Sequence, residues 1–338
     1  MVNTGVIDAD GHVRDDDKWI SKYIEAPYDE RPRHVSGARD GFDNTRGGRL
    51  GTRVVDVNTW LDALDRGGID TTVLYPTGSL GLGWLAEPDY AVARARAYNN
   101  FLSEEYMKVN PRFKGVALLP AQDPDEAVKE LRRCVNELGM VGGLLGEGPR
   151  LFGKPEYHPI WAEAERLGTM IAIHGSGRLT GTMDEWLFER FVQVHSLGHA
   201  FTQMKQFVSI IFDGVPELFP NVRIAFLEAG CGWAVYMLDR MDERYGMRGD
   251  VDSPLMVKPP SEYVADGNIY VSLEADERLL PETMRILGDD KFVYASDFPH
   301  WDGEFPGNIK HLLSREDLTQ EQRTKITSLN AKRLYGLE

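Results

Sequence analysis

Aspartate and histidine residues stand directly after several short apolar segments of this chain, where their side chains could hold a metal ion. Asp10 and His12 follow the first such segment, His174 ends another, and Asp297 follows a third. Imidazole nitrogens and carboxylate oxygens together form a mixed ligand set that suits Zn2+ or Mn2+. Three or four protein ligands leave room for water or substrate, which is typical of a catalytic metal site. Each residue taken alone also has a structural explanation, as a hydrogen-bonding group or a turn former.

The spacing within the first segment supports a shared site. Alternate side chains of an extended strand point to the same side. Asp8, Asp10 and His12 are therefore expected on one face, with the small residues Ala9 and Gly11 on the other. Asp10 and His12 would then project together, whereas Asp8 could instead serve only to tie down the strand end.

Short segments rich in β-branched and apolar residues recur along the chain, and most are followed by a stretch with helical spacing. The strands are predicted at Gly5–Asp10, Thr71–Pro76, Lys114–Leu119, Val141–Leu145, Thr169–His174, Val222–Glu228, Asn268–Leu273 and Lys291–Ser296. Helical stripes of apolar residues occur at Asp125–Leu138 and Trp233–Tyr245. Eight such βα units predict an α/β fold, a single (β/α)8 TIM barrel over residues 1–338, with its active site at the carboxyl ends of the strands. A doubly wound open sheet is the alternative, but no glycine-rich phosphate-binding sequence follows the first strand.

Loop insertions are expected after the first and the fifth strand, at residues 14–53 and 176–199, and a further irregular stretch at Tyr245–Pro260. Long irregular loops in a compact domain often act as lids or binding loops. Solvated surface loops are the other explanation.

The charge of the chain excludes some partners. The formal net charge is -15, which argues against nucleic acid and against anionic membrane surfaces. An anionic small-molecule substrate is not excluded, because a net charge does not define the local field in a pocket. No apolar run approaches the roughly 18 residues of a membrane-spanning helix, and no signal-peptide pattern is visible, so we expect a cytoplasmic protein. The two cysteines, Cys134 and Cys231, are far apart and form neither a disulfide framework nor a CxxC motif.

Several sequence blocks carry a resemblance to a known family. They are Val6–His12, Ile171–His174, Phe226–Trp233, Tyr294–His300 and Asn330–Gly336. In this order they resemble the amidohydrolase superfamily, and within it aminocarboxymuconate-semialdehyde decarboxylase and its aromatic-acid decarboxylase relatives. The Ser-Asp-x-Pro-His pattern that ends at His300 is the most specific block.

The resemblance implies a role for each matching residue. The metal ligands fall on Asp10, His12, His174 and Asp297, and Asp297 is also the family's acid/base. Many relatives carry histidine or glutamate at the position of Asp10, so aspartate is a departure there, although a carboxylate still binds a hard cation.

Three further residues are implied near the reacting group. Glu228 stands where many relatives have a histidine, which adds a negative charge and removes an imidazole. His199 could supply that imidazole as a catalytic group, or it could be structural; His195 is expected to be structural. His300 is expected to form hydrogen bonds beside the metal and the substrate.

Two reaction classes fit this set of residues. Nonoxidative decarboxylation of a small hydroxylated aromatic or muconate-like acid is favoured, because relatives of this kind are largely carboxy-lyases. Hydrolysis of an amide, ester, lactone or C–C bond by metal-activated water is the alternative, since the same residues serve both. A non-catalytic barrel that only binds a ligand is the alternative from another class, and absence of metal would indicate it.

Substrate contacts and assembly follow less directly from the sequence. Arg178 is the first candidate to anchor a substrate carboxylate, and Trp301 the first to stack on a planar substrate. Trp60, Tyr75 and Trp84 are other stacking candidates, for which core packing is the favoured explanation. One divalent ion, Zn2+ or Mn2+, and a homodimer or higher homo-oligomer complete the expectations.

Overall fold

Eight parallel strands follow one another in sequence order around a barrel. The computed structural model describes residues 5–15, 17–29, 55–175, 188, 190–300 and 303–338. The strands are β1 (Ile7–Val13), β2 (Thr71–Pro76), β3 (Phe113–Leu118), β4 (Gly142–Gly146), β5 (Met170–His174), β6 (Arg223–Leu227), β7 (Ile269–Leu273) and β8 (Phe292–Tyr294). The predicted (β/α)8 barrel is confirmed. Each predicted strand is present: β2 has the predicted bounds, and the ends of the other strands differ from the prediction by at most three residues.

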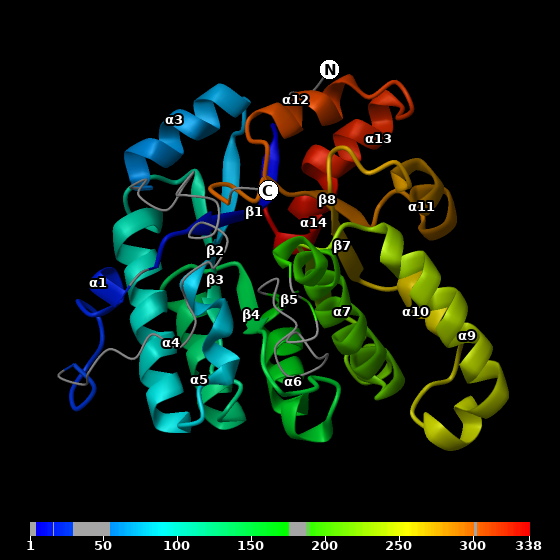
Figure 1. Ribbon diagram of the computed structural model, residues 1–338. Coiled ribbons are helices and arrows are strands. Elements are labelled where there is room, and N and C mark those ends of the chain that lie inside the picture. Colours follow the sequence, from blue (N-terminus) through cyan, green and yellow to red (C-terminus); the bar gives the residue numbers. More distant parts are fainter. Residues whose placement is uncertain (1–4, 16, 30–54, 176–187, 189, 301–302) are drawn as a thin grey trace.

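Helices surround the strands, as Figure 1 shows. The α-helices are α1 (Asp17–Ile20), α3 (Val57–Gly67), α4 (Pro88–Leu102), α5 (Pro124–Asn136), α6 (His158–Leu167), α7 (Phe191–Phe212), α8 (Val215–Leu218), α9 (Gly232–Asp252), α10 (Pro260–Asp266), α11 (Leu280–Leu287), α12 (Gly307–Ser314), α13 (Gln320–Thr324) and α14 (Asn330–Tyr335). Two 3-10 helices are η1 (Gly78–Trp84) and η3 (Pro155–Tyr157), and two π-helical segments are η2 (Ser103–Met107) and η5 (Lys325–Leu329).

Strands β5 and β7 are buried along their whole length because both of their faces are covered. All five residues of β5 are buried, as are all five of β7. This is the pattern expected where helices cover one face of a parallel sheet and the barrel interior covers the other. Helix α5 begins after a capping residue, Asp123, whose carboxylate accepts a hydrogen bond from the amide of Glu126.

The barrel closes between β1 and β8 through side-chain as well as backbone contacts. The amide of Ser296 donates to Asp8 Oδ1 at 2.8 Å, and its hydroxyl donates to Asp8 Oδ2 at 2.7 Å. Thr72 of β2 donates to the same carboxylate at 2.7 Å. Burial raises the pKa of Asp8 to about 6, although the hydrogen bonds from Thr72 and Ser296 oppose this rise. Asp8 therefore links three strands and ties down the strand end.

The prediction that Asp8 shares a face with Asp10 and His12 is wrong. The pairing of β1 with β2 shifts register between Asp8 and Gly11, which is a β-bulge. A Cβ on Gly11 would lie 2.9 Å from Asp8 Oδ2 and 2.5 Å from the Trp60 ring of α3, so Asp8 lies on the side of the strand that faces this helix. The extra residue breaks the strict alternation on which the prediction depended.

The last helix, α14, packs against three strands of the barrel. In Figure 1, α14 lies beside β1 and β8, which it contacts together with β6. The hydroxyl of Tyr335 in α14 donates to the carbonyl of Ala9 at 2.6 Å and lies 2.8 Å from the hydroxyl of Tyr75. Through Tyr335, helix α14 is thus hydrogen-bonded to β1 at the residue before Asp10.

Most of the two predicted insertions, residues 30–54 and 176–187, lies outside the described residues. Residues 17–20 form α1, and residues 191–199 form the first part of α7. The irregular stretch predicted at Tyr245–Pro260 is wrong in its first half, because α9 continues to Asp252. Ion pairs one turn apart, such as Arg248 with Asp252, support this part of α9 despite its glycines.

Cys134 and Cys231 are buried and free, as expected. Among the described residues, no helix has both the length and the apolar character that crossing a membrane requires.

Candidate metal centre

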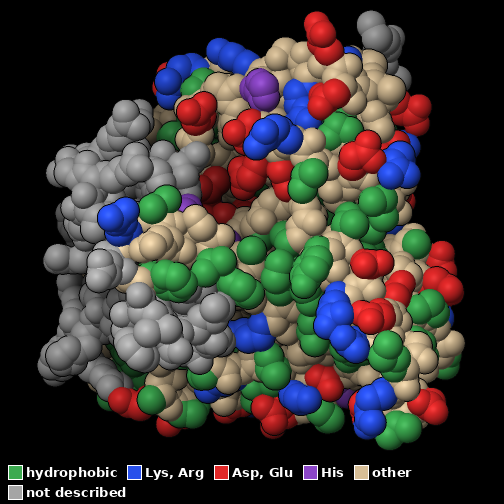
Figure 2. Space-filling view, turned by 45° about the vertical axis from the view of Figure 1, so that its right-hand side comes forward, with side chains coloured by type: hydrophobic (Ala, Val, Ile, Leu, Met, Phe, Trp, Pro, Cys, Tyr) green, Lys and Arg blue, Asp and Glu red, His purple; other side chains and the backbone are tan. Residues whose placement is uncertain are grey.

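Acidic and histidine side chains from four strand ends meet at one end of the barrel. Asp10 and His12 come from β1, His174 ends β5, Glu228 directly follows β6, and Asp297 follows β8. Figure 2 shows acidic side chains gathered in a hollow of the molecular surface. The carboxyl ends of the strands are where barrel enzymes carry their active sites.

Close contacts join the side chains of Asp10, His12, His174 and Asp297. Asp10 Oδ1 lies 3.4 Å from His12 Nε2, and Asp10 Oδ2 lies 3.3 Å from His174 Nε2. Asp297 Oδ1 lies 3.4 Å from His12 Nε2. The structure therefore brings together the four residues for which the sequence predicts metal ligation.

Four atoms of this cluster are buried and have no hydrogen-bond partner among the described residues. They are both carboxylate oxygens of Asp10, Nε2 of His12 and Nε2 of His174. Buried polar atoms normally have partners, because an unsatisfied one costs about 1–3 kcal/mol. Four such atoms facing one another are what a bound cation would satisfy, so these residues fit a divalent metal ion.

Backbone carbonyls orient both imidazole rings for metal binding. His12 Nδ1 lies 2.8 Å from the carbonyl of Pro76, and His174 Nδ1 lies 2.6 Å from the carbonyl of Gly175. A carbonyl only accepts hydrogen bonds, so Nδ1 must carry the proton in both rings and Nε2 presents a lone pair. Burial lowers the pKa of His12 well below its usual value, with His300 and His174 adding to the shift, so this ring is neutral.

A second group of potential ligand atoms overlaps the first. His12, Glu228, Asp297 and His300 each offer one atom, and these atoms lie within 4.8 Å of one another. His12 also belongs to the group with Asp10 and His174. Nδ1 of His12 is hydrogen-bonded to the carbonyl of Pro76. Only Nε2 of this ring therefore has a lone pair for a metal ion, and this lone pair can bind only one ion. The two groups therefore form one cluster that shares His12 and is bordered by Glu228 and His300.

Helix α7 supplies two residues to the rim of this centre. Nε2 of His199 lies 3.6 Å from Oε1 of Glu228, and Oε2 of Glu228 lies 3.2 Å from Nε2 of His174. One turn further along α7, the amide of Gln203 donates to the carbonyls of Ile173 at 3.1 Å and Leu227 at 2.7 Å. Gln203 thus fixes the ends of β5 and β6, which carry His174 and Glu228.

Sequence reasoning missed Gln203, although a polar residue one helical turn after His199 was a usable signal. His195 packs its ring against that of His199 at 5.2 Å between centroids, which agrees with the structural role expected for it.

Two residues of the site have an unusual backbone conformation. Glu228 has φ 54° and Asp297 has φ 51°, and they are the non-glycine residues with positive φ in the part of the chain that the structure describes. Such conformations cost about 1–3 kcal/mol and tend to occur at functional sites. Hydrogen bonds hold both: the amide of Glu228 donates to Ser272 Oγ at 2.8 Å, and the amide of Asp297 donates to the carbonyl of Asp10 at 3.0 Å.

Other candidates from the sequence are not part of this cluster. Arg178 and Trp301 lie outside the described residues. Trp60 and Tyr75 are fully buried, in agreement with core packing; the Trp60 ring packs against Phe298 and its Nε1 donates to the carbonyl of His12 at 3.1 Å. Trp60 therefore supports the first strand from outside the barrel.

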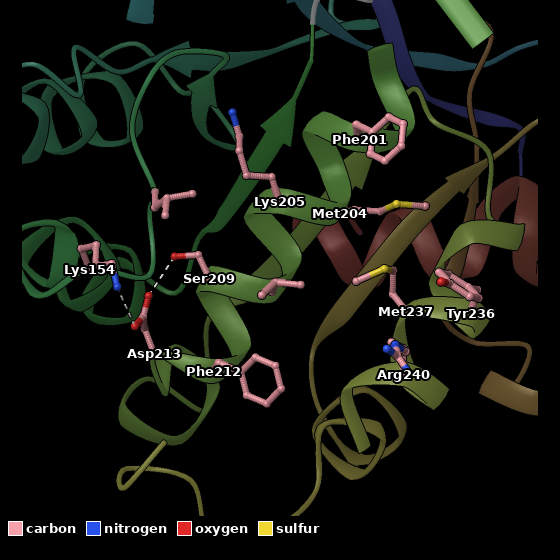
Figure 3. A pocket seen from close by; sticks show the side chains of 12 residues that line it. Lys154, Phe201, Met204, Lys205, Ser209, Phe212, Asp213, Tyr236, Met237 and Arg240 are labelled. Carbon is pink, nitrogen blue, oxygen red and sulfur yellow. Dashed lines mark hydrogen bonds and ion pairs between the residues drawn. The ribbon is translucent and has the colours of Figure 1, made fainter. Parts of the chain in front are cut away.

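A pocket of about 830 Å³ lies between α7 and α9, away from the metal cluster (Figure 3). Apolar side chains, including Phe201, Met204 and Met237, form most of its wall. The ion pair of Lys154 with Asp213, at 3.1 Å, borders it. No residue of the metal cluster lines this pocket, so it is not the place for the chemistry considered above.

Comparisons with known proteins find similar sequences over most of the chain. Residues 7–337 match the sequence profile of a family described as amidohydrolase. The chain is 30% identical to gamma-resorcylate decarboxylase of Rhodococcus jostii (strain RHA1), over 86% of this chain and 90% of that protein. It is 27% identical to 2-amino-3-carboxymuconate-6-semialdehyde decarboxylase of Dictyostelium discoideum, over 85% of this chain and 79% of the other.

A solved structure shares the fold along almost the whole chain. It is 5-carboxyvanillate decarboxylase from Novosphingobium aromaticivorans DSM 12444, complexed with manganese and 4-hydroxy-3-methoxy-5-nitrobenzoic acid. The TM-score is 0.80 at 20% identity, and the match covers 98% of this chain and 96% of that one.

Proposed function

Since this chain belongs to the amidohydrolase family, we propose that it is a metal-dependent carboxy-lyase that removes CO2 from a small hydroxylated aromatic or muconate-like acid. One observation carries the proposal: the buried, mutually facing ligand atoms of Asp10, His12 and His174, with Asp297 beside them. Two relatives that match over most of their length are decarboxylases, of gamma-resorcylate and of 2-amino-3-carboxymuconate-6-semialdehyde, which supports the choice of reaction.

Asp10, His12, His174 and Asp297 would hold one divalent ion. Two imidazoles and two carboxylates suit both Mn2+ and Zn2+, and the manganese in 5-carboxyvanillate decarboxylase favours Mn2+. When bound, the ion would supply a Lewis acid that orients the substrate carboxylate and stabilises negative charge during the reaction.

Asp297 is suited to deliver the proton that the reaction needs. Loss of CO2 breaks the bond between the carboxyl group and its carbon. That carbon takes up one proton in exchange, which the Asp297 carboxylate must first take up from solvent water. Asp297 Oδ1 faces the cluster, 3.4 Å from His12 Nε2, and lies 2.6 Å from Nδ1 of His300. General acids placed in this way typically contribute about 10²–10⁴-fold to the rate.

Glu228 and His199 are suited to hold the substrate beside the reacting carbon. A carboxylate accepts hydrogen bonds, so Glu228 can bind a hydroxyl group of the substrate. His199 Nε2, 3.6 Å from Oε1 of Glu228, orients that carboxylate and supplies the imidazole that many relatives place on β6. Arg178 and Trp301 remain proposed contacts for the carboxylate and the ring of the substrate.

An isotope experiment tests the reaction class. The protein, reconstituted with Mn2+ or Zn2+, is incubated with carboxyl-13C-labelled hydroxybenzoates and muconate-like acids in D2O, and separately with amides and lactones in H2 18O. We expect 13CO2 and one deuteron on the carbon that lost it, with turnover about 10²–10⁴-fold slower in the Asp297→Asn variant. Entry of 18O into a new carboxylate, without CO2, would establish a hydrolase instead.

We further propose that the protein acts in the cytoplasm on an anionic substrate, as a homodimer or larger homo-oligomer. Tyr236, Met247 and Val251 lie exposed on one stripe of α9 and offer an apolar surface for association. Light scattering after size-exclusion chromatography tests this, and a mass of 38.1 kDa at all concentrations would contradict it.

A further inference from the structure

Thr77 follows β2 at the mouth of the barrel and occupies the position before the first turn of η1. A threonine at this position usually caps its own helix through its hydroxyl group. Here the Thr77 side chain forms no such bond. Asp15, a buried residue after β1, caps the turn instead. Its carboxylate accepts hydrogen bonds from the amides of Thr77 at 2.8 Å, Gly78 at 2.7 Å and Ser79 at 2.8 Å.

Because Asp15 caps the turn, the hydroxyl of Thr77 can serve another residue. Thr77 Oγ1 lies 3.1 Å from Nε2 of His300, and Nδ1 of His300 lies 2.6 Å from Oδ1 of Asp297. A carboxylate accepts hydrogen bonds, so Nδ1 donates to Asp297, and Nε2 then accepts from the hydroxyl of Thr77. This chain of contacts runs from Asp15 through Thr77 and His300 to Asp297.

Both ring nitrogens of His300 are thus engaged by other protein groups. In this arrangement His300 is not a metal ligand, and its ring lies against that of His12 with 4.2 Å between centroids. His300 instead provides a fixed hydrogen-bond donor to Asp297. The backbone of Asp297 has φ 51°, an unfavourable conformation that persists only when surrounding contacts stabilise it.

We propose that Thr77 is a positioning residue for the reaction: its hydroxyl fixes the ring of His300, which in turn holds the Asp297 carboxylate toward the substrate. The role of Asp297 rests on the function proposed above, whereas the bond between Thr77 and His300 does not. Asp15 contributes by capping η1, which leaves the threonine hydroxyl available.

Two substitutions of similar size separate this role from a packing role. Thr77→Val keeps the volume and removes the hydroxyl, and Thr77→Ser keeps the hydroxyl and removes a methyl group. We expect Thr77→Val to lower kcat by about 10–100-fold, as loss of an outer partner of a metal site typically does. In Thr77→Val, KM and metal content should stay at wild-type values. In Thr77→Ser, kcat should stay close to the wild-type value as well. Equal kcat in both variants would overturn the proposal.

A spectroscopic measurement tests the contact without any substrate. Protein labelled with 15N in the histidine rings is reconstituted with diamagnetic Zn2+, and the His300 signals are identified by their loss in His300→Gln. We expect the Nε2 resonance of His300 to move in Thr77→Val and to stay in place in Thr77→Ser. An unmoved resonance in Thr77→Val would overturn the proposal, even if decarboxylation is found. A moved resonance with no turnover of any acid would instead count against the proposed function alone.

Folding is checked by circular dichroism in each variant. Should Thr77→Val not fold, Thr77→Ala enters the same comparison with Thr77→Ser, with the same expected loss of kcat and the same shift of the His300 resonance.

Discussion

The amide of Asp297 donates a hydrogen bond of 3.0 Å to the carbonyl of Asp10, which joins the ends of the last and the first strand. The amide of His12 donates at 2.8 Å to the carbonyl of Phe298 in the same connection. Backbone closure of the barrel thus places the two carboxylates in one mouth, where His12 lies between them. The position of the candidate metal centre is therefore a consequence of how the barrel closes.

His174 is expected to be required for metal binding. His174→Ala removes an Nε2 atom that faces Asp10 Oδ2 at 3.3 Å. Loss of a residue that only hydrogen-bonds to a metal ligand typically lowers metal affinity by about 10–100-fold. We expect the loss of metal affinity in His174→Ala to be larger, because His174 would bind the ion itself. Elemental analysis after dialysis measures this. His311→Ala, at an exposed histidine of α12, is the matched control; full occupancy in His174→Ala would show that another residue is the ligand.

Asp297 is expected to be required for turnover. Asp297→Asn keeps an oxygen that can face His12 and His300 but cannot deliver a proton in the same way. We expect kcat to fall by about 10²–10⁴-fold with little change in substrate binding. Rates of CO2 release at saturating substrate, normalised to metal content, measure the effect. A kcat close to wild type would exclude the acid role.

Glu228 is expected to recognise a hydroxyl group of the substrate. Glu228→Gln keeps the shape and removes the charge, and a hydrogen bond to a charged group contributes about 1.5–3 kcal/mol. We therefore expect kcat/KM for hydroxylated acids to fall by about 10–150-fold, with metal content unchanged. Acids in which the hydroxyl is methylated serve as controls, because they should be poor substrates for both proteins. Loss of metal from Glu228→Gln would instead make Glu228 a ligand.

Gly11 is expected to be essential for the bulge in β1. A Cβ at this position would lie 2.5 Å from both Thr72 Oγ1 and the Trp60 ring. We expect Gly11→Ala to lower the free energy of unfolding by about 1–3 kcal/mol, as overpacking in a core does. Gly246→Ala in α9, where a Cβ meets nothing within 4 Å, should instead be stabilising by about 0.5–1 kcal/mol.

Urea unfolding with chelator present measures both changes. Equal stability of the Gly11→Ala variant and the wild type would mean that the strand can move away from Trp60.

The positions of the strands, and hence of the site, could be predicted because buried parallel strands are short apolar runs and the barrel gathers their ends. Asp10, His12 and His174 could be placed near one another because they lie in or at the end of such strands. Their role as metal ligands was expected from this pattern together with the resemblance. Strict alternation failed at Asp8 because a bulge depends on contacts with Thr72 and Trp60, which are remote in sequence.

Features that depend on tertiary contacts were not predictable in the same way. Gln203 acts on the carbonyls of Ile173 and Leu227, and nothing near Gln203 in the sequence specifies those partners. The link from Asp15 through Thr77 to His300 likewise joins three strand ends. His199 was recognised as a candidate only through the resemblance, because its distance from Glu228 depends on how α7 crosses the barrel mouth.

Elemental analysis of the wild-type protein, purified without added metal and without a nickel column, measures whether the cluster of Asp10, His12, His174 and Asp297 binds a metal ion. We predict close to one Mn2+ or Zn2+ per chain, removal of the ion by a chelator, and its return on reconstitution. A protein that contains no divalent metal and takes up none on reconstitution would contradict the metal centre, and would favour a barrel that binds a ligand without catalysis.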